Sequence, residues 1–151
     1  MSVRPTPALR AMLVPTEHQE QVALFAWAGV MAARYPELDE MFAVPNAGGY
    51  KGGYGSNRLL AIRAKREGVK PGIEDVMLLV ARGGWHGLLM ELKRVDATPS
   101  DVKQAQRTWH KRHALRGFRV EVCKGAEAAE AVLLDYLALP VTRVSRAGVD
   151  G

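Results

Sequence analysis

Cysteine is almost absent from this chain, which has only Cys123 among its 151 residues. A single cysteine cannot form an intramolecular disulfide, so the sequence excludes a disulfide-stapled domain and favours a reducing, cytoplasmic compartment. We expect Cys123 to pack in the interior. The lone cysteine also leaves no tetrahedral zinc set, and the four histidines form no H-E-x-x-H motif.

Long apolar runs are missing as well. No stretch approaches the ~18 apolar residues that cross a bilayer, and the opening MSVRPTPALR lacks the apolar core of a secretory signal. The glycine-rich stretch GGYKGGYG matches neither the dinucleotide nor the P-loop phosphate motif. We therefore expect a soluble intracellular protein with no membrane partner, in which this stretch is a flexible loop.

Charge is unevenly distributed along the chain, whose formal net charge is +5. Residues 17–40 hold five acids against one base (net −4), residues 51–70 hold six bases against one acid (+5), and residues 93–119 hold eight bases against two acids (+6). Bases flanking an acidic segment are expected of a metal site that faces a phosphate backbone. Solvated helix faces explain the same distribution equally well.

Apolar periodicity and end signals predict one α/β domain, which 151 residues can form with a sizeable core. We expect a flexible segment at 1–15, the domain at 16–139 and a flexible tail at 140–151. Helices are predicted at 17–35, 56–66, 98–116 and 126–137, and strands at 41–45, 75–81, 86–93 and 118–123.

The predicted helices have recognisable starts. Thr16 and Thr98 are N-cap candidates, and Thr98 begins a capping-box-like TPSD. The apolar face of the first helix is expected to comprise Val22, Phe25, Ala26, Gly29, Val30 and Ala33. The last strand alternates Phe118, Val120 and Val122 with Arg119, Glu121 and Cys123, which predicts a half-buried strand.

Two apolar, strand-like runs carry charged residues that a buried sheet does not tolerate unpaired. Side chains alternate along a strand, so Glu91 and Lys93 point one way and Met90 the other. A hairpin turn at residues 82–85 brings Asp75 and Glu91 to the same open end. Two carboxylates and an ammonium are thus expected in one cleft.

This set of side chains suits phosphodiester hydrolysis. Two oxygen ligands with room for water are what Mg²⁺ or Mn²⁺ prefers, and the ion can activate a water and neutralise charge on a phosphate. Lys93 can orient that water or steady the developing charge, and beside two carboxylates it should stay protonated. The alternative is an Asp at a strand start with an exposed Glu–Lys pair on an edge strand.

Five motifs occur in the chain in the order TEHQEQ, VPNAGG, EGVKPGIEDVMLL, GLLMELKR and PSDVKQAQRTW. Together they resemble the VRR-NUC branch of the PD-(D/E)XK nuclease superfamily, over about residues 16–137. The resemblance implies a metal-dependent nuclease of a stand-alone, phage type with a restriction-endonuclease-like core, in which helices flank a central mixed sheet. It further implies that Asp75 and Glu91 bind the metal and that Lys93 is the catalytic lysine.

The resemblance extends to two helices. Glu17 matches the family's N-terminal acid, and so its third metal-binding and catalytic carboxylate, and Gln21 matches its companion glutamine. From the residues alone Glu17 and Glu20 remain alternatives, and an acidic first turn that favours the helix N-terminus explains both. Gln106 matches the family's catalytic-site glutamine, three residues before Trp109.

The helix that carries Gln106 should turn one face towards the sheet, formed by Val102, Gln106, Trp109 and His113. Gln106 then needs a partner, either in the cleft or at a backbone carbonyl. His110 and His113 are expected to be surface or packing residues. Glu74 stands where the family usually has proline, and we expect it to point to solvent, with a third acid near the metal as the alternative.

DNA is the predicted partner. Phosphate contacts are expected from Lys51, Arg58, Lys65, Arg66, Lys70, Lys103 and Arg107. Such contacts carry no sequence information, so selectivity for shape, such as flaps or junctions, is expected. A homodimer would present two active sites to two strands. The rival from another class is a non-catalytic nucleic-acid-binding accessory protein on the same fold.

Overall fold

The computed structural model describes residues 6–45 and 58–143. In chain order the elements are α1 (Pro7–Leu13), α2 (Glu17–Met31), η1 (Pro36–Glu40), β1 (Phe42–Ala43), α3 (Arg58–Arg66), β2 (Val76–Leu78), β3 (Leu88–Lys93), η3 (Pro99–Asp101), α4 (Gln104–Leu115), β4 (Arg119–Lys124) and α5 (Ala126–Leu137). The predicted glycine-rich loop GGYKGGYG, with Lys51, lies outside the described residues. Helix α1 was not predicted, because seven residues are too few for periodicity to reveal a helix.

The strands form one mixed sheet in the order β1-β2-β3-β4. Strands β1, β2 and β3 pair antiparallel, and β4 pairs parallel with β3 because α4 crosses over between them. The predicted hairpin is present: β2 returns as β3 through a turn in which Gly83 and Gly84 have φ of 58° and 86°, a region that suits glycine. The predicted α/β layout, a mixed sheet flanked by helices, is confirmed.

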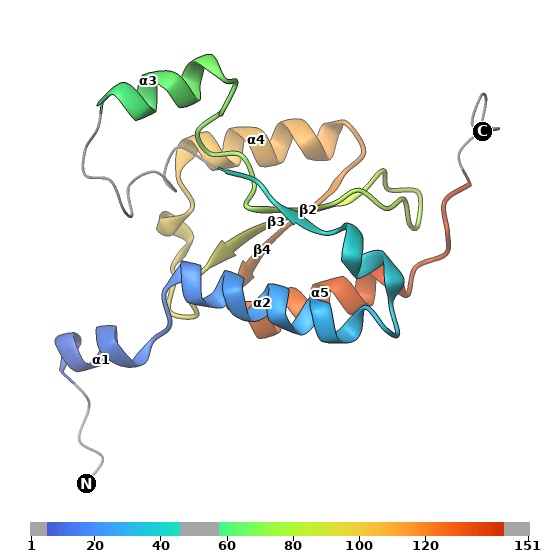
Figure 1. Ribbon diagram of the computed structural model, residues 1–151, viewed down its shortest axis with the longest axis horizontal. Coiled ribbons are helices and arrows are strands. Elements are labelled where there is room, and N and C mark those ends of the chain that lie inside the picture. Colours follow the sequence, from blue (N-terminus) through green and yellow to red (C-terminus); the bar gives the residue numbers. More distant parts are fainter. Residues whose placement is uncertain (1–5, 46–57, 144–151) are drawn as a thin grey trace, which may run out of the picture.

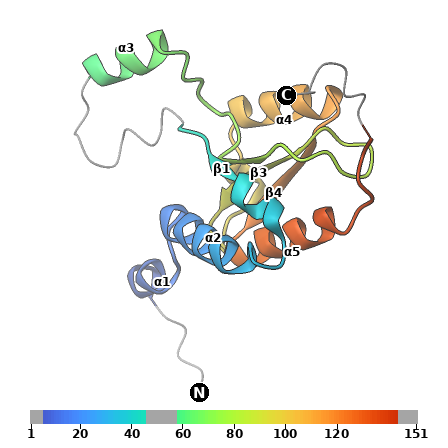
Figure 2. The same ribbon diagram turned by 45° about the vertical axis from the view of Figure 1, so that its right-hand side comes forward.

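Helices cover both faces of the sheet (Figures 1 and 2). Helices α2 and α5 pack on one face and on each other, and α4 packs on the other face against β4. The main core lies between the sheet and the α2–α5 layer and is formed by Leu24, Ala28, Val76, Leu78, Leu88, Met90, Leu92, Cys123, Ala129, Leu133 and Tyr136. None of the described helices is both long and apolar enough to cross a membrane.

The buried face of α2 differs from the predicted one. Val22 and Val30 are 56% and 76% exposed, while Leu24 and Ala28 enter the core. The segment is apolar on nearly every side of the helix, so periodicity could not select a face. Contact with α5 selected it instead.

Strand β4 buries Cys123 and leaves Val122 exposed. Cys123 belongs to the core between the sheet and the α2–α5 layer, which confirms its predicted packing role. Val122 lies on the opposite face of an edge strand. The predicted alternation of side chains along the strand was therefore right. The fully buried residue, however, is Cys123 and not Val122 of the predicted apolar set.

The thiol of Cys123 is expected to resist modification in the folded protein. Burial raises the pKa of Cys123 to about 11, so at pH 8 roughly one thiol in a thousand is a thiolate, and the side chain is closed to reagent. Labelling with Ellman's reagent should be slow at pH 8, faster as the pH rises towards 11, and complete in guanidinium chloride. Rapid stoichiometric labelling of the native protein at pH 8 would contradict the buried position.

Capping fixes the start of α2 as predicted. Gln19 N donates to Thr16 Oγ1 at 3.2 Å, and Thr16 N donates to Gln19 Oε1 at 2.9 Å. Glu20 has a different task. Its carboxylate is buried and accepts a hydrogen bond from Ala126 N at 2.8 Å, which satisfies the first turn of α5, where Gly125 offers no capping side chain.

The helix predicted at 98–116 is two helices. Thr98 caps only the single turn η3, since Asp101 Oδ2 folds back to accept from Thr98 N at 2.7 Å. After an extended Val102, Gln106 Oε1 accepts from Lys103 N at 2.8 Å and starts α4 anew. The second start places the side chain of Gln106 beside the sheet.

Candidate active site

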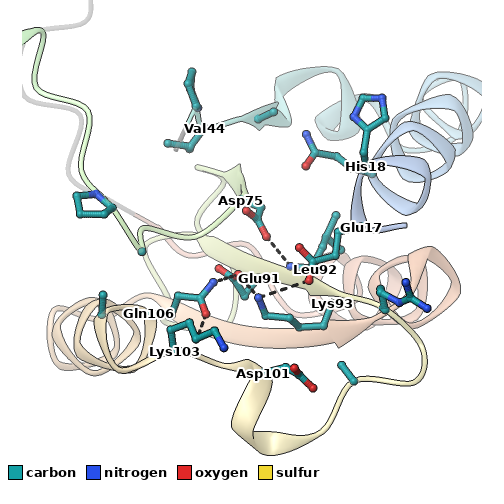
Figure 3. A pocket seen from close by; sticks show the side chains of 18 of the residues that line it. Glu17, His18, Val44, Asp75, Glu91, Leu92, Lys93, Asp101, Lys103 and Gln106 are labelled. Carbon is teal, nitrogen blue, oxygen red and sulfur yellow. Dashed lines mark hydrogen bonds and ion pairs between the residues drawn. The ribbon is translucent and has the colours of Figure 1, made fainter. Parts of the chain in front are cut away.

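The hairpin brings Asp75, Glu91 and Lys93 together (Figure 3). Glu91 and Lys93 point to the same side of β3 and are only 1% and 6% exposed, and Glu91 Oε1 lies 3.0 Å from Lys93 Nζ. Asp75 directly precedes β2, and its Oδ2 accepts a hydrogen bond from Leu92 N at 2.8 Å. Because β3 is an interior strand, the alternative of an exposed Glu–Lys pair on an edge strand is wrong.

Glu17 approaches the same cleft from the first turn of α2 (Figure 3). Its Oε1 lies 3.7 Å from Lys93 Nζ, and half of its side chain is exposed. Gln21, one turn later, also lines the cleft. Of the two acids that sequence reasoning left open, Glu17 is the one at the cleft, while Glu20 serves α5.

Gln106 reaches the site from α4. Its Nε2 donates to Glu91 Oε1, and its Oε1 accepts from Lys103 N, so both ends of the amide are held. Of the two predicted alternatives, the partner of Gln106 is thus the cleft carboxylate. Glu91 Oε1 is shared between Gln106 and Lys93.

The electrostatics of the site follow from burial and proximity. Burial, and next the neighbouring Glu91, raise the pKa of Asp75 to about 7, against the lowering effects of the Leu92 N–H and of Lys93. Burial alone would lower the pKa of Lys93, but Glu91 together with Glu17 and Asp75 raises it above its ordinary value. Lys93 therefore stays protonated, as expected beside these carboxylates.

The donor set fits a small divalent cation. Within the described residues no group of three or more His, Cys, Asp or Glu side chains is close enough to hold a metal. Asp75 and Glu91 are the two carboxylates that would hold one, with water and a phosphate oxygen as further ligands. This is the coordination that Mg²⁺ accepts, and a cation would offset the burial, and next the repulsion from Glu91, that raise the pKa of Asp75. When bound, such an ion lowers the pKa of a water and neutralises charge on a phosphate. Glu17 contacts Lys93 instead, and its role as a metal ligand stays a prediction.

The site opens into a cleft of about 1100 Å³ between α2, the hairpin and the start of α4. Besides Lys93, the bases in its lining are Lys103 and Arg94, whose Nε lies 3.0 Å from Asp96 Oδ1. His18 lies at its α2 side (Figure 3). Sequence reasoning missed Arg94 and His18 as cleft residues. The only sequence signal for either residue was its position, since Arg94 directly follows Lys93 and His18 directly follows Glu17.

The predicted phosphate-binding residues are dispersed. Of those described, only Lys103 lines the cleft. Helix α3, which carries Arg58, Lys65 and Arg66, stands apart from the sheet and from the α2–α5 layer in both ribbon views (Figures 1 and 2). Lys70 is exposed and does not line the cleft, Arg107 donates to the carbonyl of Pro99, and Lys51 lies outside the described residues.

Glu74 does not point to solvent, so that prediction is wrong. Its side chain is fully buried, and Oε2 lies 2.7 Å from Nδ1 of His113 on α4. Glu74 and Asp75 lie before β2, where the chain bends, and their side chains diverge: Asp75 lines the cleft, and Glu74 contacts His113 further along α4. His113 is accordingly the partner of a buried acid.

Trp109 completes the contact between α4 and the loop before β2. Its ring stacks on His113, and its Nε1 donates to the carbonyl of Pro71 at 3.1 Å. The predicted inward face of this helix is confirmed for Gln106, Trp109 and His113. Val102 lies before the helix.

These elements define an α/β domain with a PD-(D/E)XK-like core, in which a hairpin carries an acid pair and a lysine. No family model matches the chain, and no curated protein matches it. A solved structure described as a VRR_NUC domain protein is similar to it, with a TM-score of 0.66 and 26% identity over 86% of this chain and 98% of the other. The resemblance to the VRR-NUC domain predicted from the motifs is thereby confirmed, and with it a nuclease-type fold.

Proposed function

We propose that this protein is a Mg²⁺- or Mn²⁺-dependent endonuclease that hydrolyses phosphodiester bonds in DNA. The observation that carries the proposal is the buried Glu91, held by Gln106 and Lys93 and set across the hairpin from Asp75 at the floor of an open cleft. A buried acid pair is costly unless a cation or a proton compensates it. The similar structure described as a VRR_NUC domain protein points the same way.

Each residue has a separate task in this proposal. Asp75 and Glu91 hold the ion, and Gln106 fixes the orientation of Glu91. Lys93 stays charged and presents its ammonium between Glu91 and Glu17, where it steadies negative charge that develops on the phosphate. Glu17 in turn keeps the ammonium directed into the cleft.

The cleft favours a substrate read by shape. Arg94 and Lys103 at its rim suit phosphate groups, which carry no sequence information. We propose flapped or branched DNA as the preferred substrate, and a homodimer as the form that addresses two strands. A sedimentation experiment that finds only monomer at micromolar concentration would remove the dimer.

Cleavage should depend on both metal and Lys93. Supercoiled, linear, flapped and four-way-junction DNA would be incubated with Mg²⁺, Mn²⁺ or EDTA, and Lys93→Ala should lower the cleavage rate by about 100-fold or more, because charge on the phosphate is no longer balanced. Arg34→Ala, a change at an exposed residue outside the cleft lining, is the control.

The same assay separates the two candidate functions. Metal-dependent cutting that is lost in Lys93→Ala supports the nuclease and reveals its preferred DNA shape. Binding without cutting by any metal would favour the non-catalytic accessory protein instead.

DNA binding should weaken steeply with salt, because phosphate contacts release condensed cations. In EDTA, which prevents cutting, a plot of log affinity against log salt should be linear, and Lys103→Ala should reduce its slope by about 1. Arg34→Ala should leave the slope unchanged. A DNA affinity that stays constant between about 50 and 200 mM salt would contradict the predicted phosphate contacts.

A further inference from the structure

Two buried polar atoms face each other at the back of the acid pair. Among the described residues, Glu91 Oε2 and His110 Nε2 are both shielded from solvent and lack a hydrogen-bond partner, and they lie 3.9 Å apart. A buried polar atom without a partner is costly, and such atoms are rare in folded proteins. Because these two atoms lie next to each other, one hydrogen bond between them would satisfy both.

His110 is placed on α4 to serve Glu91. It follows Gln106 by four residues, so the two side chains project from the same face of the helix. Gln106 and Lys93 take Oε1 of the carboxylate, which leaves Oε2 to His110. A shift of about 1 Å brings Nε2 and Oε2 within hydrogen-bond range.

The chemistry of the pair fixes the direction of the bond. An ionised carboxylate only accepts hydrogen bonds, so the imidazole must donate, and it must carry its proton on Nε2. Oε1 already accepts from Gln106 and contacts the Lys93 ammonium, so the lone pair left open to a cation is the second one of Oε2.

We infer that His110 is a positioning residue that holds Glu91 through a hydrogen bond from Nε2–H to Oε2. The inference rests on the proposed function in that Glu91 is taken to bind the metal. Helix α4 then donates a hydrogen bond to each oxygen of Glu91, to Oε1 from Gln106 and to Oε2 from His110. A metal ligand whose supporting hydrogen bond is removed typically loses about 10- to 100-fold in metal affinity.

The tautomer of His110 tests the inference without any metal. Long-range ¹H–¹⁵N correlation spectra of the full ¹⁵N-labelled chain at pH 8 in EDTA should show His110 protonated at Nε2, with a proton that exchanges slowly with solvent. Glu91→Gln should shift that signal, while His86, outside the cleft lining, should not respond. A ring protonated at Nδ1, or a rapidly exchanging Nε2 proton, would overturn the inference.

Calorimetry with Mn²⁺ gives the second readout. His110→Ala should weaken Mn²⁺ binding by about 10- to 100-fold, His110→Gln should restore most of it by offering an amide donor, and His86→Ala should bind like wild type. Unchanged affinity in His110→Ala, in a variant that melts like wild type, would assign His110 to packing alone. If wild type itself binds no Mn²⁺, the proposed function fails, and the tautomer measurement still decides whether His110 supports Glu91.

Discussion

Asp75→Asn is expected to abolish metal-dependent cleavage and, at the same time, to stabilise the metal-free protein at pH 8. Asp75 supplies one of the two carboxylates of the site, so its loss should remove Mn²⁺ binding. In the metal-free protein the same carboxylate is partly buried beside Glu91, where its charge is unfavourable. Asparagine keeps an oxygen that can accept from Leu92 N and has no charge.

The pH dependence of this stabilisation follows from the raised pKa. In the folded protein the pKa of Asp75 is about 7, against an ordinary value of 3.8. Between these values the folded state binds more protons than the unfolded chain, so the stability of the wild type falls as pH rises from about 4 to about 7. The advantage of Asp75→Asn should therefore be largest above pH 7, at about 1–3 kcal/mol, and shrink towards pH 5.

Urea unfolding at pH 5 and pH 8 in EDTA measures this difference. The exposed Asp39→Asn serves as a matched control and should change the free energy of unfolding by less than about 0.5 kcal/mol. An Asp75→Asn protein no more stable than wild type at pH 8 would refute the buried-charge explanation. Retained cleavage would refute the proposed site.

His113→Ala should be the most destabilising single change on α4. It leaves the fully buried Glu74 without its hydrogen-bond partner, and a buried polar group left unsatisfied in this way costs about 1–3 kcal/mol. It also removes the ring on which Trp109 stacks. Urea unfolding at pH 7 gives the loss directly, and Lys111→Ala, exposed on the same helix, should be nearly neutral.

The double variant Glu74→Leu, His113→Leu tests the cause of that loss. Removing both polar partners leaves no orphaned charge, so most of the stability should return. If the double variant is as unstable as His113→Ala, loss of packing rather than an unpaired carboxylate is responsible. Because Glu74 directly precedes Asp75, His113→Ala should also weaken Mn²⁺ binding, and the double variant should recover part of it.

The central part of the site could be predicted from the sequence. A strand alternates its side chains with period two, and a two-glycine turn sets the register of the hairpin, so residues within one contiguous stretch determine where Asp75, Glu91 and Lys93 lie relative to each other. The capping of α2 by Thr16 was predictable for the same reason, since both bonding partners lie within one turn. Local geometry needs no knowledge of the rest of the fold.

The tertiary structure alone decided which face of α2 is buried, which of its acids enters the cleft, and what Glu74 and His110 contact. Helix α2 is apolar almost all round, so only its packing on α5 directs Glu20 to Ala126 and Glu17 to Lys93. Glu74 and His113 are 39 residues apart and meet because α4 crosses over the sheet between β3 and β4. A sequence pattern repeats along one element, whereas the partner of a buried charge is chosen by how two elements pack together.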